Sequence, residues 1–221
     1  MFRVIKAGGD PKRCSFAGVG KTTEEIRYAL EQGIYCINIE SLAELEFINN
    51  VAESISELAP VAVRINPNVD AQTHKYISTG KAENKFGIDY EETMKVYERA
   101  SALPHIQIKG IQMHIGSQLT TVSPFVEAVE RVIPLVKELQ QTYGIEFFSI
   151  GGGIGIVYEE ALASGPSNWW SEQENPPLSP DVYARELLPL LRGLKLKIVL
   201  EPGRYMSGNA GVLLTSCLYE K

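Results

Sequence analysis

The chain alternates short apolar runs with longer segments in which apolar residues recur every three or four positions. A short apolar run is typical of a buried strand, and the longer period is typical of a helix with one buried face. On this pattern six strands are expected, at residues 14–19, 34–39, 61–65, 106–114, 147–150 and 196–200. Strands that alternate with helices predict βα units around a parallel sheet, so we expect one α/β domain without an internal boundary.

Capping residues indicate where the first two helices begin. Thr22 with Glu25, and Ser41 with Glu44, have the spacing of a capping box, in which side chains satisfy free backbone N–H groups. Gly33 is the expected end of the first helix. Each helix is expected to bury three apolar side chains: Ile26, Ala29 and Leu30 in the first, and Leu42, Leu45 and Ile48 in the second.

The longest helix is expected to begin at Ser123 and Pro124 and to end at Gly144. Pro134 lies inside it and predicts a kink, because a proline ring cannot donate the helical hydrogen bond. One face is expected to be buried, with the side chains of Phe125, Val129, Val132, Val136 and Leu139.

Three segments depart from the alternation. Residues 66–87 form a loop far longer than most βα connections, which favours a functional role. Within it, Lys85 is expected to be solvated rather than placed over an anion. Residues 158–178 contain Trp169 and Trp170, which either cover the site or a partner surface or pin a loop. Residues 211–219 form an apolar tail, interpreted as a possible further strand.

Three of the predicted strands are followed by residues suited to catalysis or anion binding. These are His114 and Ser117, then the triplet Gly151, Gly152 and Gly153, and finally Glu201, Pro202, Gly203 and Arg204. The carboxyl ends of the strands of a (β/α)8 barrel carry its active site, often with a bound phosphate. Consecutive glycines let several N–H groups point at one phosphate, and a guanidinium binds that anion or a substrate carboxylate. We therefore expect these residues to form one site.

Two other candidates were weighed against this site. Gly20, Lys21 and Thr22 resemble the end of a P-loop, but that motif requires glycine at position 15, where Ser15 stands, so a nucleotide site is rejected. Arg64 is either an anion ligand at the barrel rim, the interpretation we favour, or an interior charge paired with a carboxylate.

Composition narrows the possible partners. The 221 residues are 44% hydrophobic and 22% charged, and a net charge of −6 without a basic cluster argues against nucleic acid as a partner. No apolar run approaches the roughly 20 residues of a membrane-spanning helix, so no membrane partner is expected. Three widely separated cysteines indicate a reduced, cytoplasmic protein. The three histidines share no ligand spacing, so no metal site is expected.

The combination of motifs resembles one protein family. The chain resembles the fold-type III pyridoxal-phosphate decarboxylases over nearly its whole length, at residues 15–22, 38–41, 64–70, 76–80, 84–87, 114–118, 151–153 and 201–204. Residues 64–87 resemble the diaminopimelate decarboxylases of this family rather than its ornithine decarboxylases. The resemblance implies an alanine racemase-like (β/α)8 barrel, here incomplete with about six βα strands in residues 1–210. Residues 211–221 would begin the connection to a C-terminal β-domain.

The same resemblance implies a role for each candidate residue with bound pyridoxal 5′-phosphate. His114 would stack on the cofactor ring, and Glu201 would hydrogen-bond the pyridine nitrogen. The phosphate would be held by Ser117, by the amides of the triplet Gly151, Gly152 and Gly153, and by the turn of Pro202, Gly203 and Arg204. Arg204 would also reach a substrate carboxylate.

The chain also departs from the family pattern. The strand with the lysine that binds the cofactor covalently would lie ahead of Met1, and the second domain would follow Lys221. We therefore expect an internal piece, inactive alone, of a homodimeric lyase that removes CO2 from meso-2,6-diaminopimelate to give L-lysine. The alternatives are a decarboxylase of another basic amino acid, a non-catalytic homologue that binds the cofactor, and a barrel that binds some other phosphorylated ligand.

Overall fold

The computed structural model describes residues 1–69, 86–156, 178–208, 210–211 and 214–219. Its strands are β1 (Ser15–Phe16), β2 (Cys36–Ile39), β3 (Ala59–Asn66), β4 (Ile88–Asp89), β5 (Ile106–Met113), β6 (Phe147–Ser149) and β7 (Lys197–Val199). The α-helices are α1 (Phe2–Lys6), α2 (Thr23–Glu31), α3 (Leu42–Ser54), α4 (Thr93–Ser101), α5 (Ser123–Tyr143), α6 (Pro180–Leu191) and α7 (Arg204–Ser207). Short 3-10 helices span Pro11–Arg13, Tyr90–Glu92 and Arg192–Leu194.

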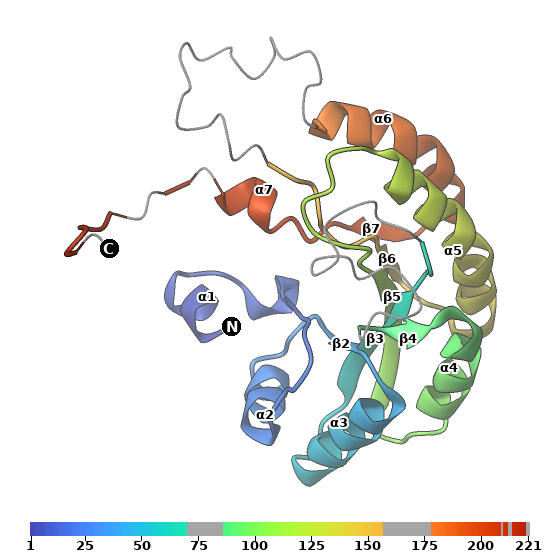
Figure 1. Ribbon diagram of the computed structural model, residues 1–221. Coiled ribbons are helices and arrows are strands. Elements are labelled where there is room, and N and C mark those ends of the chain that lie inside the picture. Colours follow the sequence, from blue (N-terminus) through green and yellow to red (C-terminus); the bar gives the residue numbers. More distant parts are fainter. Residues whose placement is uncertain (70–85, 157–177, 209, 212–213, 220–221) are drawn as a thin grey trace.

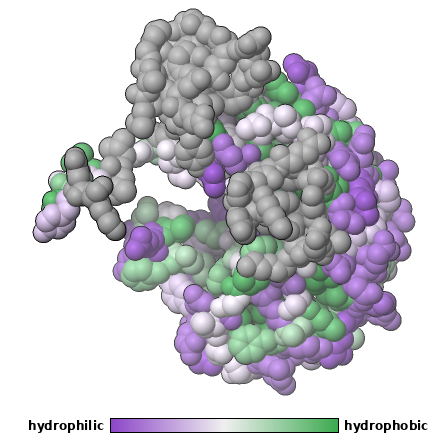
Figure 2. All heavy atoms as spheres, viewed as in Figure 1, coloured by the Kyte–Doolittle hydropathy of each residue, from purple (hydrophilic) through white to green (hydrophobic). Residues whose placement is uncertain are grey.

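The strands form one parallel sheet in the order β1-β2-β3-β5-β6-β7, and β4 pairs with β3 beside this path. The sheet curls, and helices α2 to α6 follow one another around its outer face (Figure 1). A hollow separates α1 from the segment around α7 (Figure 2). The six-strand path confirms the predicted open (β/α) barrel.

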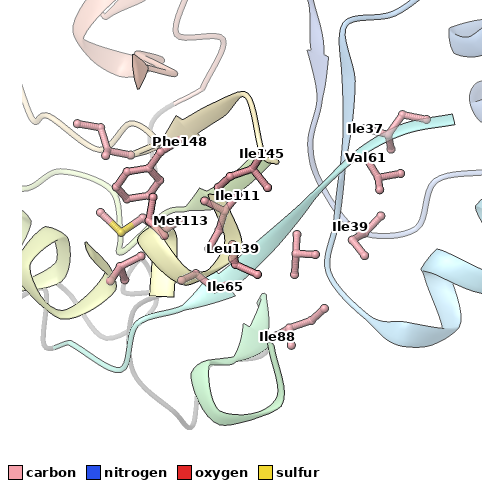
Figure 3. Close-up of a cluster of buried hydrophobic side chains, with 14 of the residues drawn as sticks. Ile37, Ile39, Val61, Ile65, Ile88, Ile111, Met113, Leu139, Ile145 and Phe148 are labelled. Atoms are coloured by element: carbon pink, nitrogen blue, oxygen red, sulfur yellow. The ribbon is translucent and has the colours of Figure 1, made fainter. Parts of the chain in front are cut away.

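Side chains alternate between the two faces of the strands, as the two-residue period of a strand requires, except where the pairing of β3 with β5 shifts register between Val61 and Ala62. The outward positions are apolar and pack under the helices, as Figure 3 shows for Ile37, Ile39, Val61, Ile65, Ile111, Met113 and Phe148. The inward positions begin with the small cluster of Cys36, Ala62 and Phe147. Toward the carboxyl ends they become polar, with Asn38, Arg64, Gln112 and Ser149. The outer face therefore supplies the core, and the inner face is left for polar groups.

The predicted caps are largely confirmed. Thr22 and Glu25 form the complete capping box of α2, and Gly33 follows the end of this helix with a left-handed φ of 68°. Ser41 caps α3, but the Glu44 carboxylate accepts the N–H of Glu40 rather than that of Ser41. The predicted buried positions of these helices are confirmed, with one exception. Leu42 is 47% exposed, because it lies at the first residue of α3.

Helix α5 matches its predicted bounds and buries all five predicted side chains. It ends at Gly144, whose φ of 65° is the left-handed conformation that glycine adopts without strain. The helix continues through Pro134 without a break.

Several predictions about strands need correction. β1 has two residues rather than six. The strand at residues 196–200 was predicted to be buried, but in β7 Lys197 is exposed and its neighbours are half-buried, because β7 lies at one end of the sheet and pairs only with β6 among the described strands. The described residues of the tail, 211 and 214–219, form no strand. Most of the 66–87 loop, Lys85 and both tryptophans lie outside the described residues.

Candidate functional site

The carboxyl ends of four strands meet around the side chain of Glu201, which follows β7. Ser149 of β6 donates from Oγ to Glu201 Oε1 at 2.7 Å, and Asn38 of β2 donates from Nδ2 to the same oxygen at 3.5 Å. Gln112 of β5 donates from Nε2 to Glu201 Oε2 at 3.3 Å. The backbone N–H of Glu201 donates to Gly151 O at 2.9 Å. These bonds connect the last predicted motif to the glycine triplet.

The glycine triplet is packed against all the neighbouring strand ends. A Cβ atom at Gly151 would overlap with the carbonyl oxygen of Met113, one at Gly152 with that of Glu201, and one at Gly153 with that of Gly116. Pro202 lies beside the same contact at Gly152. No side chain fits at these three positions, so the backbone of the triplet joins the ends of β5, β6 and β7 into one surface.

His114, the first residue after β5, is held in one tautomer. Its Nδ1 accepts the N–H of Gly152 at 3.3 Å, so the ring proton of the neutral imidazole is on Nε2. Burial, and after it the nearby positive charge of Arg64, lowers the pKa of His114 to about 4. The site therefore contains an uncharged, flat imidazole at neutral pH.

Two N–H groups of the triplet already have partners inside the protein. Gly151 donates to Ser149 Oγ at 3.3 Å, and Gly152 donates to His114 Nδ1. Both bonds are long for N–H donors, which leaves them easy to exchange for an anion. Phosphate binding by these amides therefore remains a prediction that requires a small local rearrangement.

Gln118 links three parts of the site, although sequence reasoning assigned it no role beyond its place in a motif. Its side-chain oxygen accepts the N–H of Ile156 at 3.1 Å, and its amide nitrogen donates to the carbonyl of the same residue. The same oxygen accepts from Arg204 at 3.5 Å. Leu119 and Ile154 form a parallel bridge next to it. The loop after β5, the glycine loop and Arg204 are therefore tied together.

The remaining predicted site residues lie at the same end of the sheet. Ser117 is half-buried in the loop after β5. Gly203 precedes the short helix α7 and accepts through its carbonyl from the Met206 N–H at 3.0 Å. Arg204 is half-buried at the first position of α7. The structure thus brings all the predicted strand-end motifs together.

Arg64 is an interior charge, so the interpretation that we favoured for it is wrong. Its guanidinium donates to Glu40 Oε1 at 2.9 Å, both side chains are almost fully buried, and it lies 5.2 Å from the ring centre of Phe86. The other carboxylate oxygen of Glu40 accepts the N–H of Gly87 at 3.3 Å. This network anchors residues 86 and 87 to the inside of the barrel.

Lys21 also has a structural environment, which supports rejection of the P-loop. Its buried ammonium donates to Gly18 O, to Asn38 O at 2.9 Å and to Glu44 Oε1 at 2.6 Å. An ammonium group has three protons, and all three are used here. Lys21 therefore joins the loop after β1, strand β2 and helix α3.

Sequence reasoning missed the donors around Glu201, namely Asn38, Gln112 and Ser149. Each stands at an inward position of a predicted strand, and Gln112 and Ser149 lie two residues before the predicted site residues His114 and Gly151. The available signal for these donors was a polar residue at an inward position of an otherwise apolar strand. The apolar neighbours, which define the strand, drew attention away from it.

Comparison with known proteins identifies the family. The family described as "Pyridoxal-dependent decarboxylase, pyridoxal binding domain" matches residues 1–208. The chain belongs to the pyridoxal-dependent decarboxylases. It is 47% identical to the diaminopimelate decarboxylase of Pseudomonas aeruginosa over 222 aligned residues, which cover 100% of this chain and 50% of that protein. The chain thus spans about half the length of the curated relatives it matches.

Solved structures of this decarboxylase family have the same fold. Diaminopimelate decarboxylase from Helicobacter pylori, complexed with L-lysine, matches with a TM-score of 0.81 and 39% identity, covering 92% of this chain and 48% of that one. The enzyme from M. jannaschii, in a co-complex with L-lysine, matches with a TM-score of 0.76 and 35% identity over 92% and 46% of the two chains. Within the described residues, no helix is long and apolar enough to cross a membrane.

The residues present fit pyridoxal phosphate, the cofactor of this pyridoxal-dependent family. A flat neutral imidazole, a carboxylate that accepts only neutral donors among the described residues, a glycine turn and a guanidinium surround one end of the sheet. A flat ring with a basic nitrogen on one side and a phosphate on the other matches this set of groups in shape and charge.

Proposed function

We propose that the full-length protein decarboxylates meso-2,6-diaminopimelate to L-lysine with pyridoxal 5′-phosphate. The observation that supports it best is the position of Glu201, whose carboxylate accepts from side chains of β2, β5 and β6 and whose backbone bonds the glycine loop that also holds the neutral His114. The 47% identity to a diaminopimelate decarboxylase over the whole chain supports the choice of substrate.

In this proposal the cofactor-binding residues have separate tasks. His114 lies against the ring, and Glu201 accepts from the pyridine nitrogen. Ser117, the triplet of Gly151, Gly152 and Gly153, and the turn of Pro202, Gly203 and Arg204 hold the phosphate. Pyridoxal phosphate supplies an electron sink for the carbanion that remains when CO2 leaves.

The chemistry of the chain's own residues follows from their charges. The Glu201 carboxylate favours a proton on the ring nitrogen, because an opposite charge stabilises the protonated form. His114 remains neutral and so adds no positive charge that would oppose this protonation. Arg204 provides a planar pair of donors for a phosphate or for a substrate carboxylate.

The lysine that binds the cofactor covalently is not Lys21 in this proposal. All three protons of its ammonium donate to protein oxygens, and its side chain is almost fully buried. A lysine so occupied is unavailable as a nucleophile without loss of these bonds.

The direct test is a decarboxylation assay on the protein in its full natural length, loaded with pyridoxal phosphate. We expect CO2 and L-lysine from meso-diaminopimelate, and little CO2 from arginine, ornithine or lysine. Cofactor binding without CO2 release from any of these amino acids would instead favour the non-catalytic alternative.

The role of Glu201 has its own test. Glu201→Gln keeps the shape but removes the charge, so we expect at least a roughly 100-fold lower kcat with the cofactor still bound. Near-normal turnover in this variant would contradict the assignment.

A further inference from the structure

Glu201 accepts side-chain hydrogen bonds from Asn38, Gln112 and Ser149, which are all neutral. We propose that these three are positioning residues that aim the Glu201 carboxylate at the ring nitrogen of the cofactor, an inference that rests on the proposed function. They come from β2, β5 and β6, so the direction of the carboxylate is fixed from three sides of the barrel interior.

The neutrality of the donors is central to this role. A cation in contact with Glu201 would cancel its charge and weaken its effect on the ring nitrogen. Among the described residues, the buried cations have carboxylates of their own, because Arg64 pairs with Glu40 and Lys21 pairs with Glu44. The arrangement therefore orients the Glu201 carboxylate and leaves its negative charge in place for the cofactor.

The hydrogen bonds also distinguish the two carboxylate oxygens. Oε1 accepts from Ser149 and Asn38, whereas Oε2 accepts only from Gln112 among the described residues, at 3.3 Å. A carboxylate oxygen accommodates about two donors. Oε2 is therefore the oxygen that receives the N–H of the ring.

The side-chain amides of Asn38 and Gln112 are oriented at an energetic cost, and this cost indicates their role. The side-chain oxygens of Asn38 and Gln112 are buried and have no hydrogen-bond partner among the described residues. An unpaired buried acceptor is unfavourable, and the flipped amide would direct its oxygen at a carboxylate, which is worse. The charge of Glu201 thus sets the orientation of both amides, and they in turn hold the carboxylate.

The test uses Ser149→Ala and Gln112→Met in the full-length protein, loaded with pyridoxal phosphate labelled with 15N at the ring. Each variant removes one donor while nearly keeping the volume. We expect the 15N signal of the ring nitrogen to move toward that of the unprotonated ring. We also expect kcat to fall about tenfold or more, as typical for a lost bond to a charged group, at nearly unchanged KM.

Two comparisons separate positioning from general damage to the structure. Ser54→Ala is the matched control, because Ser54 also donates a 2.7 Å bond, to Val51 O in α3, and should leave both readouts unchanged. The Ser149 hydroxyl also accepts the N–H of Gly151, so Ser149→Ala removes a hydrogen bond of the glycine loop as well. Gln112→Met leaves that bond in place and should still move the nitrogen signal.

Each remaining outcome overturns a specific statement. If the wild type shows a protonated ring nitrogen and both variants keep that signal, the inference fails, whether or not turnover falls, and the proposed function stands. If the wild type takes up no pyridoxal phosphate, the proposed function fails and this inference fails with it.

Discussion

At the scale of single residues, charge state decides what the site can do. His114 and Glu201 lie at the ends of β5 and β7, and the surroundings keep the first neutral and hold the second between neutral donors. Both residues are readable in the sequence, but their electrostatic surroundings come from residues 50 to more than 150 positions away, such as Arg64 and Asn38.

The lowered pKa of His114 predicts a pH dependence of stability. The folded value is about 4 and the ordinary value is 6.5, so between these the unfolded chain binds a proton that the folded chain does not. The free energy of unfolding should therefore fall as the pH decreases from about 6.5 to about 4, by up to about 3 kcal/mol from this residue.

Chemical denaturation across that pH range, with His114→Gln as the comparison, measures this contribution. The variant lacks the titrating ring, so its stability should decline less over the same range. An imidazole that titrates near 6.5 in an NMR experiment on the folded protein would contradict the prediction.

At the scale of elements, two short segments hold the strand ends together: the glycine triplet and the loop around Lys21. Neither forms a helix or a strand. Each joins several elements through close backbone contacts or a buried ion pair. A substitution in either segment should therefore affect the stability of the neighbouring strands and helices as well as the loop itself.

Gly152→Ala should destabilise the protein and impair cofactor binding. The added Cβ would overlap with the carbonyl oxygen of Glu201, so the turn after β7 has to move, at a cost of about 1–3 kcal/mol typical of overpacking. Gly193→Ala is the matched control, because a Cβ at that position meets no atom within 4 Å. Thermal unfolding and cofactor titration of both variants test this, and equal behaviour of the two would contradict it.

Lys21→Met should destabilise the fold strongly. It leaves the half-enclosed Glu44 carboxylate without its cation, and loss of one partner of a buried pair typically costs about 3–5 kcal/mol. Lys95→Met removes the exposed 2.8 Å pair with Glu92 and should have little effect. Urea denaturation of the two variants gives the comparison. A specific loss of phosphate binding in Lys21→Met, with stability unchanged, would revive the P-loop interpretation.

At the scale of the whole molecule, the curled sheet is open. Among the described strands β1 pairs only with β2 and β7 pairs only with β6, so each presents one unpaired edge. The hollow beside α1 lies on this open side (Figure 2). The inner face of the sheet is consequently less enclosed than in a closed barrel.

The 221-residue chain on its own should therefore self-associate. Unpaired N–H and C=O groups at strand edges bind other chains, and exposed apolar side chains such as Leu200 and Met206 add to this tendency. Light scattering as a function of concentration should show species larger than the monomer. A monodisperse monomer that also releases CO2 from diaminopimelate would contradict both this prediction and the expectation that the chain alone is inactive.

The sequence by itself determined the order of strands and helices, most helix ends and the group of motifs at the strand ends. These features depend on local rules: the period of apolar residues, the capping chemistry of Thr22 and Ser41, and the need for glycine at Gly33 and Gly144. Local rules act within a few residues, so a single chain is enough to read them.

Only the tertiary structure decided which polar residues meet. Arg64 pairs with Glu40 inside the barrel, and Lys21 pairs with Glu44. Glu201 accepts hydrogen bonds from side chains of β2, β5 and β6. The same limit explains why β7 is half-exposed at the end of the sheet rather than buried. Strand order and register set these contacts, and they depend on how distant segments pack rather than on the residues adjacent in sequence.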